Sequence, residues 1–222
     1  MLTNEQFVLL TNGTKLLNVE LAQGNIAWIA IYLEELKRWA KIVDLVSQSD
    51  PEVIIRKHVL DSLAALAVLP LHGRLLDLGS GAGFPGLPLA IANPALSVTL
   101  LEPRRKRVNF LKQVIRKTNL TNTQVYEGRA EDFAGTDGWQ SAFDIVITRA
   151  TWNIREFLLR AAPFVSADGI LAAMKGKKAE ELQSATKDLE TLNLMLKTEH
   201  RYTLPYGNER RSIFVFKKKS FT

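Results

Sequence analysis

The ten residues Asp77–Gly86 read DLGSGAGFPG, and this stretch decides the fold that we predict. It follows an apolar strand expected at residues 74–78 and precedes a helix expected at residues 85–92. Glycine adopts positive φ easily and lets a ligand approach the backbone, while the N-terminus of the following helix presents unpaired amides. A strand, a glycine-rich turn and a helix in this order indicate a nucleotide-type cofactor loop. A tight turn that holds no ligand is the alternative.

Downstream of this loop, short apolar runs alternate with amphipathic segments, which is typical of a parallel sheet. The further expected strands are residues 97–101, 124–127, 143–148 and 169–174. The further expected helices are residues 104–118, 154–162 and 179–191. The chain closes with strands at 194–203 and 212–218, which we expect to pair as an antiparallel hairpin. Lys217, Lys218 and Lys219 end this hairpin, and we expect them to protect a sheet edge.

Upstream of the loop, the pattern is helical. Residues 24–47 carry apolar side chains at alternating spacings of four and three, which predicts an amphipathic helix. Asp50 and Pro51 form a cap and a first-turn proline for a second helix that should run towards Leu69 and end at Pro70. We therefore predict a helical extension over residues 1–72, packed on an α/β domain over residues 73–222.

Composition limits the classes of site and partner. The 222 residues contain no cysteine, which excludes disulfides and thiolate catalysis, and three histidines far apart in sequence, so we expect no metal site. No apolar run approaches the roughly 18 residues that suggest a membrane span, and the first residues do not resemble a signal peptide. We expect a cytoplasmic protein without membrane contact. A net charge of +6 favours a polyanionic partner, although scattered cations are also ordinary on a solvated surface.

The identity of the cofactor rests on the residues around the loop. Glu102 ends the next expected strand, near the roughly 20-residue offset at which an acidic side chain receives ribose hydroxyls. Asp77 directly precedes the glycines, where it would repel a pyrophosphate but could accept from the ammonium of a methionine. Residues 129–132, after the third strand, can recognise the amine of adenine. With the terminal hairpin, these features favour S-adenosylmethionine over NAD.

Several motifs occur together in an order and spacing that characterise one family. They are Arg56–Ser62 (RKHVLDS), Asp77–Gly86, Lys106–Val108 with Phe110 and Leu111, Ile147–Ala150 (ITRA), Lys175 with Gly176, and Glu209–Arg211 (ERR). Together they resemble the ribosomal RNA small subunit methyltransferase G family, also called glucose-inhibited division protein B, over nearly the whole chain. The resemblance implies a class I S-adenosylmethionine-dependent methyltransferase fold, which is Rossmann-like with a seven-stranded, mostly parallel sheet.

The family resemblance also implies a reaction and a substrate. The family transfers a methyl group from S-adenosylmethionine, leaving S-adenosylhomocysteine, to N7 of a guanine in the 530 loop of 16S rRNA. That guanine is position 527 by the family's convention, and the partner is 16S rRNA within the 30S subunit or an assembly intermediate. The implied cofactor contacts are Gly79, Phe84, Ala130, Glu131 and Arg149, to which the loop pattern adds Asp77, Gly81, Gly83 and Glu102. Family members commonly carry aspartate and serine where this chain has Glu102 and Pro103, and we expect the longer carboxylate to keep the ribose contact.

The predicted catalytic residues are cations that follow strand ends or flank the terminal hairpin: Arg129, Arg149, Lys175 and Arg210. Guanine N7 carries an in-plane lone pair and no proton, so alignment should dominate and no general base is needed. We expect these cations to guide phosphates, O6 of guanine or the cofactor. A structural ion pair is the alternative for each, with Glu131, Asp132 or Asp144 as partners of Arg129 and Arg149.

His58 and Asp61 lie three residues apart and therefore on one helical face, where they could touch each other or the cofactor pocket. A capping or buried hydrogen-bond role is the alternative for this pair. Trp152, beside Arg149, is the tryptophan placed best to contact a ligand. Three other readings stay open: a methyltransferase acting on another RNA or on a small molecule, an NAD-dependent oxidoreductase, and a noncatalytic RNA-binding protein.

Overall fold

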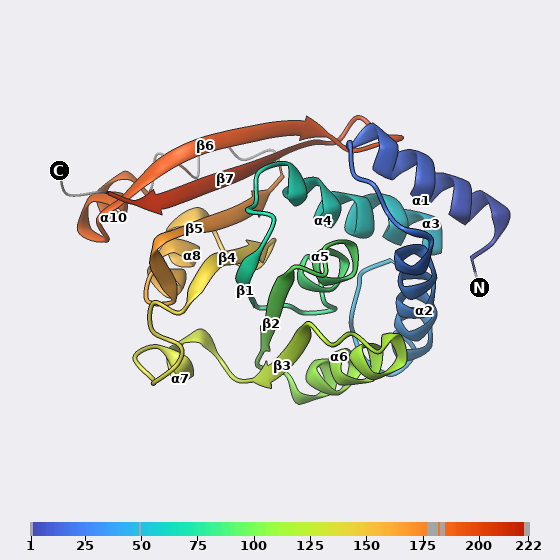
Figure 1. Cartoon of the computed structure of the whole chain (residues 1–222), viewed down its shortest axis with the longest axis horizontal. Coiled ribbons are helices and arrows are strands. Elements are labelled where there is room, and N and C mark those ends of the chain that lie inside the picture. The colour runs from blue at the N-terminus through green and yellow to red at the C-terminus, as the bar shows by residue number, and fades with distance from the viewer. Residues whose placement is uncertain (1, 49, 177–181, 183–184, 220–222) are drawn as a thin grey trace.

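The computed structural model describes residues 2–48, 50–176, 182 and 185–219, and Figure 1 shows a single twisted sheet with helices on both faces. The strands are β1 Gly73–Leu78, β2 Leu96–Glu102, β3 Thr123–Glu127, β4 Phe143–Arg149, β5 Val165–Lys175, β6 Leu194–Thr203 and β7 Arg210–Lys218. Their order is β3-β2-β1-β4-β5-β7-β6, with β1 to β5 parallel and β7 antiparallel to both of its neighbours. The predicted seven-stranded sheet with a terminal antiparallel hairpin is confirmed.

The helices of the α/β part alternate with the strands as predicted. They are α5 Gly86–Ala92, α6 Arg105–Thr118, α7 Ala130–Phe133, α8 Ile154–Ala161 and α10 Thr186–Thr191. The short helix α7 was not predicted. Part of the helix predicted at 179–191 falls on residues 177–181 and 183–184, which lie outside the described residues.

Two apolar clusters explain the layers, because side chains alternate between the faces of a strand. On one face, Leu75 and Ile147 join a cluster that includes buried residues of α2, α5 and α6. On the other face, Leu76 and Val146 join a cluster that includes α8. The sheet is therefore covered on both sides, as a largely parallel sheet requires.

The N-terminal helices belong to the first of these layers. They are α1 Asn4–Leu16, α2 Gln23–Trp39, α3 Pro51–Ile54, the π-helix η1 Ile55–Leu60, α4 Asp61–Leu63 and the 3₁₀-helix η2 Ala64–Ala67. The cap is as predicted, since the Asp50 side chain accepts from Glu52 N. The Tyr32 hydroxyl also donates to Ala82 O in the glycine-rich loop at 2.6 Å. The extension thus packs directly on the predicted cofactor loop, while the boundary between residues 72 and 73 stays a prediction.

The structure differs from the prediction at two places in the N-terminal region. Helix α1 was missed, and α2 ends at Trp39 rather than at residue 47. The segment after Trp39 turns towards α6, where Asp44 O accepts from Arg107 Nε and Nη2 at 3.2 and 2.8 Å. The predicted second helix is present over residues 51–67, and within it residues 55–60 are wound as a π-helix.

The C-terminal lysines do not protect a sheet edge. Strand β7, which contains Lys217 and Lys218, pairs with β5 on one side and β6 on the other, so β6 forms the edge. Lys218 Nζ donates to Val165 O at 2.8 Å. No helix in the described part of the chain combines the length and hydrophobicity of a membrane span.

Candidate active site

Asp77 is the penultimate residue of β1, close to the start of the glycine-rich loop, and is fully buried. Its Oδ2 atom accepts from Gly86 N at 3.0 Å, and its backbone oxygen accepts from the Ser80 hydroxyl at 2.9 Å. Its Oδ1 atom has no hydrogen-bond partner among the described residues. Burial raises the pKa of this carboxyl to about 7. Asp77 therefore holds the glycine-rich loop through the Gly86 amide and the Ser80 hydroxyl.

The predicted cofactor glycines differ in what surrounds them. Gly79 has φ +69°, and a Cβ atom there would lie 3.1 Å from Thr151 Cγ2 in the wall of a cavity. Gly81 N donates to Glu102 Oε2 at 2.9 Å. Gly83 has φ +96°, but a Cβ atom there would lie 2.5 Å from Leu87 Cδ1, inside the apolar core. Gly79 thus faces the cavity, whereas Gly83 serves the packing of the loop.

Glu102 lies at the carboxyl end of β2 and is 3% exposed. Its Oε2 atom accepts from Gly81 N, and its Oε1 atom accepts from Arg104 N at 3.0 Å. Two backbone amides therefore fix the carboxylate at the wall of the cavity. The longer side chain of glutamate is accommodated because it folds back onto the loop.

The cavity has a volume of about 340 Å³ and opens among the loops that follow β1, β2, β3 and β4. Its lining includes Gly79, Glu102, Arg129, Ala130, Glu131 and Trp152. This volume falls within the usual range for small-molecule sites, and its place is the carboxyl edge where open α/β sheets bind ligands. We call it the cofactor cavity.

Arg160 closes one side of the cofactor cavity and was not predicted. Its Nε atom pairs with Glu131 Oε1 at 3.1 Å, and its guanidinium lies 5.6 Å from the centre of the Trp152 ring. Glu131 is therefore engaged by a residue from α8 rather than by Arg129. Trp152, the tryptophan singled out from the sequence, lines the cavity.

A second pocket of about 470 Å³ lies across the loop that follows β4. Ala150 lines this pocket, whereas the next residues, Thr151 and Trp152, line the cofactor cavity. The residues with ionisable side chains in its lining are Lys57, His58, Asp61, Arg149, Lys175 and Arg211. We call it the basic pocket.

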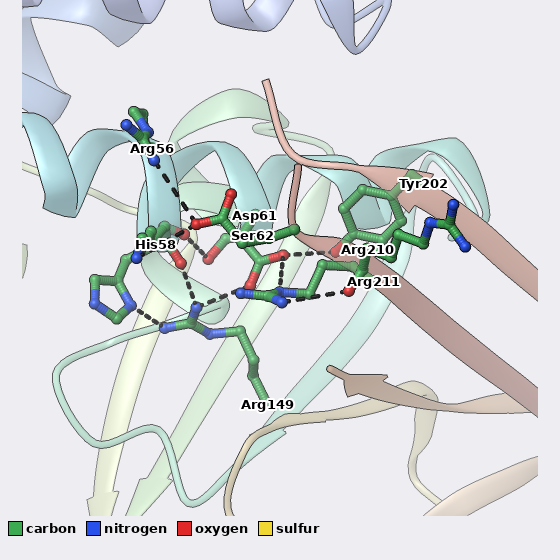
Figure 2. Close-up of polar contacts among 10 residues, drawn as sticks. Arg56, His58, Asp61, Ser62, Arg149, Tyr202, Arg210 and Arg211 are labelled. Carbon is green, nitrogen blue, oxygen red and sulfur yellow. Dashed lines mark hydrogen bonds and ion pairs between the residues drawn. The ribbon is translucent and has the colours of Figure 1, made fainter. Parts of the chain in front are cut away.

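Arg149 is the centre of the basic pocket (Figure 2). Its Nη1 atom donates to Lys57 O and to Asp61 Oδ2, each at 3.0 Å. Its Nη2 atom lies 2.7 Å from His58 Nδ1. The guanidinium carbon also lies 5.2 Å from the centre of the Phe84 ring. Polar contacts with residues 57–61 and the contact with the Phe84 ring therefore orient this side chain.

Asp61 joins three elements that are distant in sequence (Figure 2). Besides Arg149 at Oδ2, its Oδ1 atom accepts from the Tyr202 hydroxyl at 2.7 Å and lies 3.7 Å from Arg211 Nε. The Asp61 side chain is only 6% exposed. Burial, and then Asp61, raise the pKa of Tyr202 well above its ordinary value, so this hydroxyl is a stable donor. A buried carboxylate needs such donors, and here they come from β4, β6 and β7.

His58 belongs to the π-helix, a rare element often found at functional sites. Its ring stacks on Phe84 with centroids 5.1 Å apart. Burial and the nearby charges of Arg149, Lys57 and Arg211 lower its pKa to about 3. The neutral ring accepts at Nδ1 from Arg149, since a guanidinium can only donate, and therefore carries its proton on Nε2.

The structure separates the four predicted catalytic cations. Arg129 lines the cofactor cavity, whereas Arg149 and Lys175 line the basic pocket. Lys175 Nζ donates to Trp152 O, which ties the basic pocket to the loop beside the cofactor cavity. Arg210 lies in neither, because alternate residues of a strand face opposite sides and Arg211 takes the inward position.

Other expectations for the site changed with the tertiary structure. Arg149, expected at the cofactor, makes its contacts in the basic pocket, and its acidic partner is Asp61 rather than Glu131, Asp132 or Asp144. Phe84 is buried between the glycine-rich loop and His58 and does not line the cofactor cavity. Tyr202 gave no sequence signal, since it lies 141 residues from Asp61. Arg211 did give a sequence signal, because it belongs to the ERR motif.

The described residues hold no group of three or more potential metal ligands.

Comparison with known proteins gives a consistent family and fold. The family model described as rRNA small subunit methyltransferase G matches residues 25–212. Ribosomal RNA small subunit methyltransferase G of Desulfitobacterium hafniense is 39% identical over 207 residues, covering 93% of this chain and 86% of the relative. The protein of the same name from Oenococcus oeni is 39% identical over 193 residues, covering 85% and 80%.

Solved structures agree at the level of the fold. TYW2 of M. jannaschii in complex with AdoMet superposes with a TM-score of 0.60 at 14% identity, covering 78% of this chain and 79% of that one. A SAM-dependent methyltransferase from Aquifex aeolicus superposes with a TM-score of 0.55 at 17% identity, covering 74% and 92%.

Proposed function

The chain belongs to the rRNA small subunit methyltransferase G family, and on that premise we propose that its two pockets divide one methyl transfer between them. Membership makes the protein an S-adenosylmethionine-dependent 16S rRNA methyltransferase. In the proposal, the cofactor cavity takes S-adenosylmethionine and the basic pocket takes the nucleotide to be methylated. The proposed acceptor is N7 of guanine 527 in the 530 loop, within the 30S subunit or an assembly intermediate.

The residues of the cofactor cavity suit S-adenosylmethionine. The fixed carboxylate of Glu102 can accept from two ribose hydroxyls, and the backbone at Ala130 with the side chain of Glu131 can recognise the adenine edge. The absence of a side chain at Gly79 leaves room beside Thr151. Oδ1 of Asp77 lies outside the cavity lining but is a buried acceptor without a partner among the described residues, which suits an ammonium group reached through water. When bound, S-adenosylmethionine supplies an electrophilic methyl group.

The observation that carries the proposed acceptor is the chemistry of the basic pocket, which offers donors rather than a base. Lys57, Arg149, Lys175 and Arg211 are cations, and the free nitrogen of His58 carries a proton. The carboxylate of Asp61 is already engaged by Arg149, Tyr202 and Arg211. Such a lining suits phosphate oxygens and O6 of guanine, and it leaves no group poised to remove a proton. N7 of guanine requires none.

The protein's contribution is therefore alignment. Arg149 and Lys175 can hold the nucleotide by its phosphate or O6 while N7 stays open towards the cofactor cavity. The loop from Ala150 to Trp152 runs between the two pockets, and the bond from Lys175 to Trp152 O holds it in place. Holding two reactants in a reactive geometry can by itself supply a large part of a rate enhancement.

Isotope-labelled S-adenosylmethionine tests this proposal with small subunits that lack the modification. After incubation, nucleosides and RNA fragments are separated by mass spectrometry. We expect labelled N7-methylguanosine in the fragment that contains the 530 loop. Label at another atom or in another fragment, or no label despite calorimetric proof of cofactor binding, would overturn the proposed acceptor. A thermal-shift comparison of S-adenosylmethionine with NAD tests the oxidoreductase alternative.

A further inference from the structure

The outer face of α6 carries an unusual concentration of positive charge. From Arg104 to Lys117 the sequence contains seven cations and no acidic residue: Arg104, Arg105, Lys106, Arg107, Lys112, Arg116 and Lys117. All are exposed except Arg107, which is half-buried and bonded to Asp44 O. The ion pairs found among the described residues involve none of the seven. Within the described part of the chain, these side chains therefore have no ion-pair partner.

The cations at the start of α6 work against the helix. Arg104 is the N-cap and makes no side-chain capping bond, and the first turn has no acidic residue. The N-terminus of a helix is the positive end of its dipole, where anions stabilise and cations destabilise. Helix stability therefore does not explain why Arg105 and Lys106 lie at this end. A bound anion would explain their position. Arg116 and Lys117, at the opposite end, are favourable for the dipole as well.

Three of the cations, together with an asparagine, form an exposed polar stripe along the helix. Arg105, Asn109, Lys112 and Arg116 follow one another at intervals of four, three and four residues, so they lie on one side of the helix and all are exposed. The apolar residues Val108, Leu111 and Val114 face the core instead. At 1.5 Å per residue, the stripe from Arg105 to Arg116 is about 16 Å long. This length suffices to lie along several phosphates of one strand.

The stripe begins at the active site. Arg104 and Arg107 line the cofactor cavity, and α6 leads from there along the β3 side of the sheet (Figure 1). A nucleic acid whose target nucleotide lies at the carboxyl edge of the sheet would meet the N-terminal end of α6 and could continue along it. The charge on α6 is therefore placed to act beyond the nucleotide that reacts.

We propose that the outer face of α6 binds the phosphate backbone of the substrate rRNA outside the target nucleotide. This inference rests on the proposed function and adds a docking surface that extends from the cofactor cavity beyond both pockets. The contacts are to phosphates, so they are independent of base sequence and add affinity and orientation. The binding constant should then depend on salt through the lysines and arginines of this helix.

The test compares two double variants that each remove two exposed lysines. Lys112→Gln with Lys117→Gln lies on the distal half of α6, away from the cofactor cavity. Lys187→Gln with Lys197→Gln, on α10 and β6, is the matched control at the opposite end of the sheet. Affinity for unmodified small subunits is measured by filter binding at several salt concentrations. Calorimetry with S-adenosylmethionine and thermal unfolding report on the cofactor cavity and the fold.

We expect the α6 double variant to bind about tenfold more weakly at low salt, with the slope of log K against log salt reduced by about 1.5. Its cofactor affinity and melting temperature should match those of the unaltered protein, and the control should keep its slope. Equal slopes for the two double variants would overturn the inference, since net charge alone would then account for both. If the unaltered protein methylates the RNA and the α6 variant binds it unchanged, only the inference fails. If the unaltered protein neither binds nor methylates it, the proposed function fails too.

Discussion

The cofactor cavity and the basic pocket lie on two sides of one loop, yet they are built in different ways. The cofactor cavity depends on backbone shape, because amides of Gly81 and Arg104 fix the carboxylate of Glu102 and a glycine keeps its wall open. The basic pocket depends on charge balance, because one buried carboxylate gathers donors from three distant strands. Substitutions that add bulk should therefore damage the first, and substitutions that remove charge should damage the second.

The largest expected effect comes from a substitution that damages the cofactor cavity alone. Gly79→Asp places a side chain where φ is +69° and where a Cβ atom already lies 3.1 Å from Thr151, and it adds a negative charge to a cavity that contains Glu102. We expect cofactor affinity to fall by about a thousandfold, since strain, bulk and repulsion act together. Isothermal titration with S-adenosylmethionine measures this.

Binding of small-subunit RNA should survive Gly79→Asp, because the cations of the basic pocket and of α6 are unchanged. Filter binding provides this control. A variant that loses RNA affinity as severely as cofactor affinity would show that the two regions are not separable.

The next largest expected effect comes from a substitution that damages the basic pocket alone. Asp61→Asn keeps the size of the side chain but removes the charge that balances Arg149, whose side chain is 14% exposed. Breaking a buried ion pair in this way should lower the free energy of unfolding by about 3 kcal/mol. We also expect a lower kcat, since Arg149 loses its fixed orientation. Urea unfolding and the methylation assay measure the two effects.

Tyr202→Phe is the matched control for Asp61→Asn, since it removes one donor to Asp61 and leaves every charge in place. The loss of one hydrogen bond should cost about 1 kcal/mol. Cofactor affinity should be unchanged in both variants. If Asp61→Asn costs no more than Tyr202→Phe, charge balance does not organise this pocket.

The smallest expected effect is on the pH dependence of stability, which one titrating group in each region should change in opposite directions. The folded-state pKa of His58 is lowered from 6.5 to about 3, so the unfolded chain binds the proton first and stability is lost as pH falls below 6.5. The folded-state pKa of Asp77 is raised from 3.8 to about 7, so the folded protein keeps its proton longer and stability is lost as pH rises towards 7. Between pH 5 and 6 the two contributions therefore have opposite signs.

His58→Gln and Asp77→Asn separate these contributions. Urea unfolding at pH 5 and 6 should show stability falling with pH in His58→Gln and rising with pH in Asp77→Asn, each by up to about 1.4 kcal/mol per pH unit. The unaltered protein should lie between them. Parallel pH dependence in both variants would contradict the assignment of one titrating group to each region.

The fold was predictable where the signal is local. Short apolar runs, glycine-rich turns and the Asp50 cap are properties of adjacent residues, and the strands and most helices of the α/β part lie where they were predicted. The early end of α2 and the π-helix at 55–60 were not predictable in this way. In both places the chain follows contacts with segments far along the sequence rather than its own periodicity.

The sequence by itself determined the cofactor loop, the parallel sheet of alternating strands and helices, and the family, because each depends on short motifs or on the pattern of neighbouring residues. Only the tertiary structure decided that Arg149 pairs with Asp61, that Arg211 rather than Arg210 enters the basic pocket, and that Lys217 and Lys218 lie on an inner strand. The physical reason is that a buried charge takes whichever partner the packed fold brings within reach. Asp61 and Tyr202 meet across 141 residues, and no local pattern encodes that meeting.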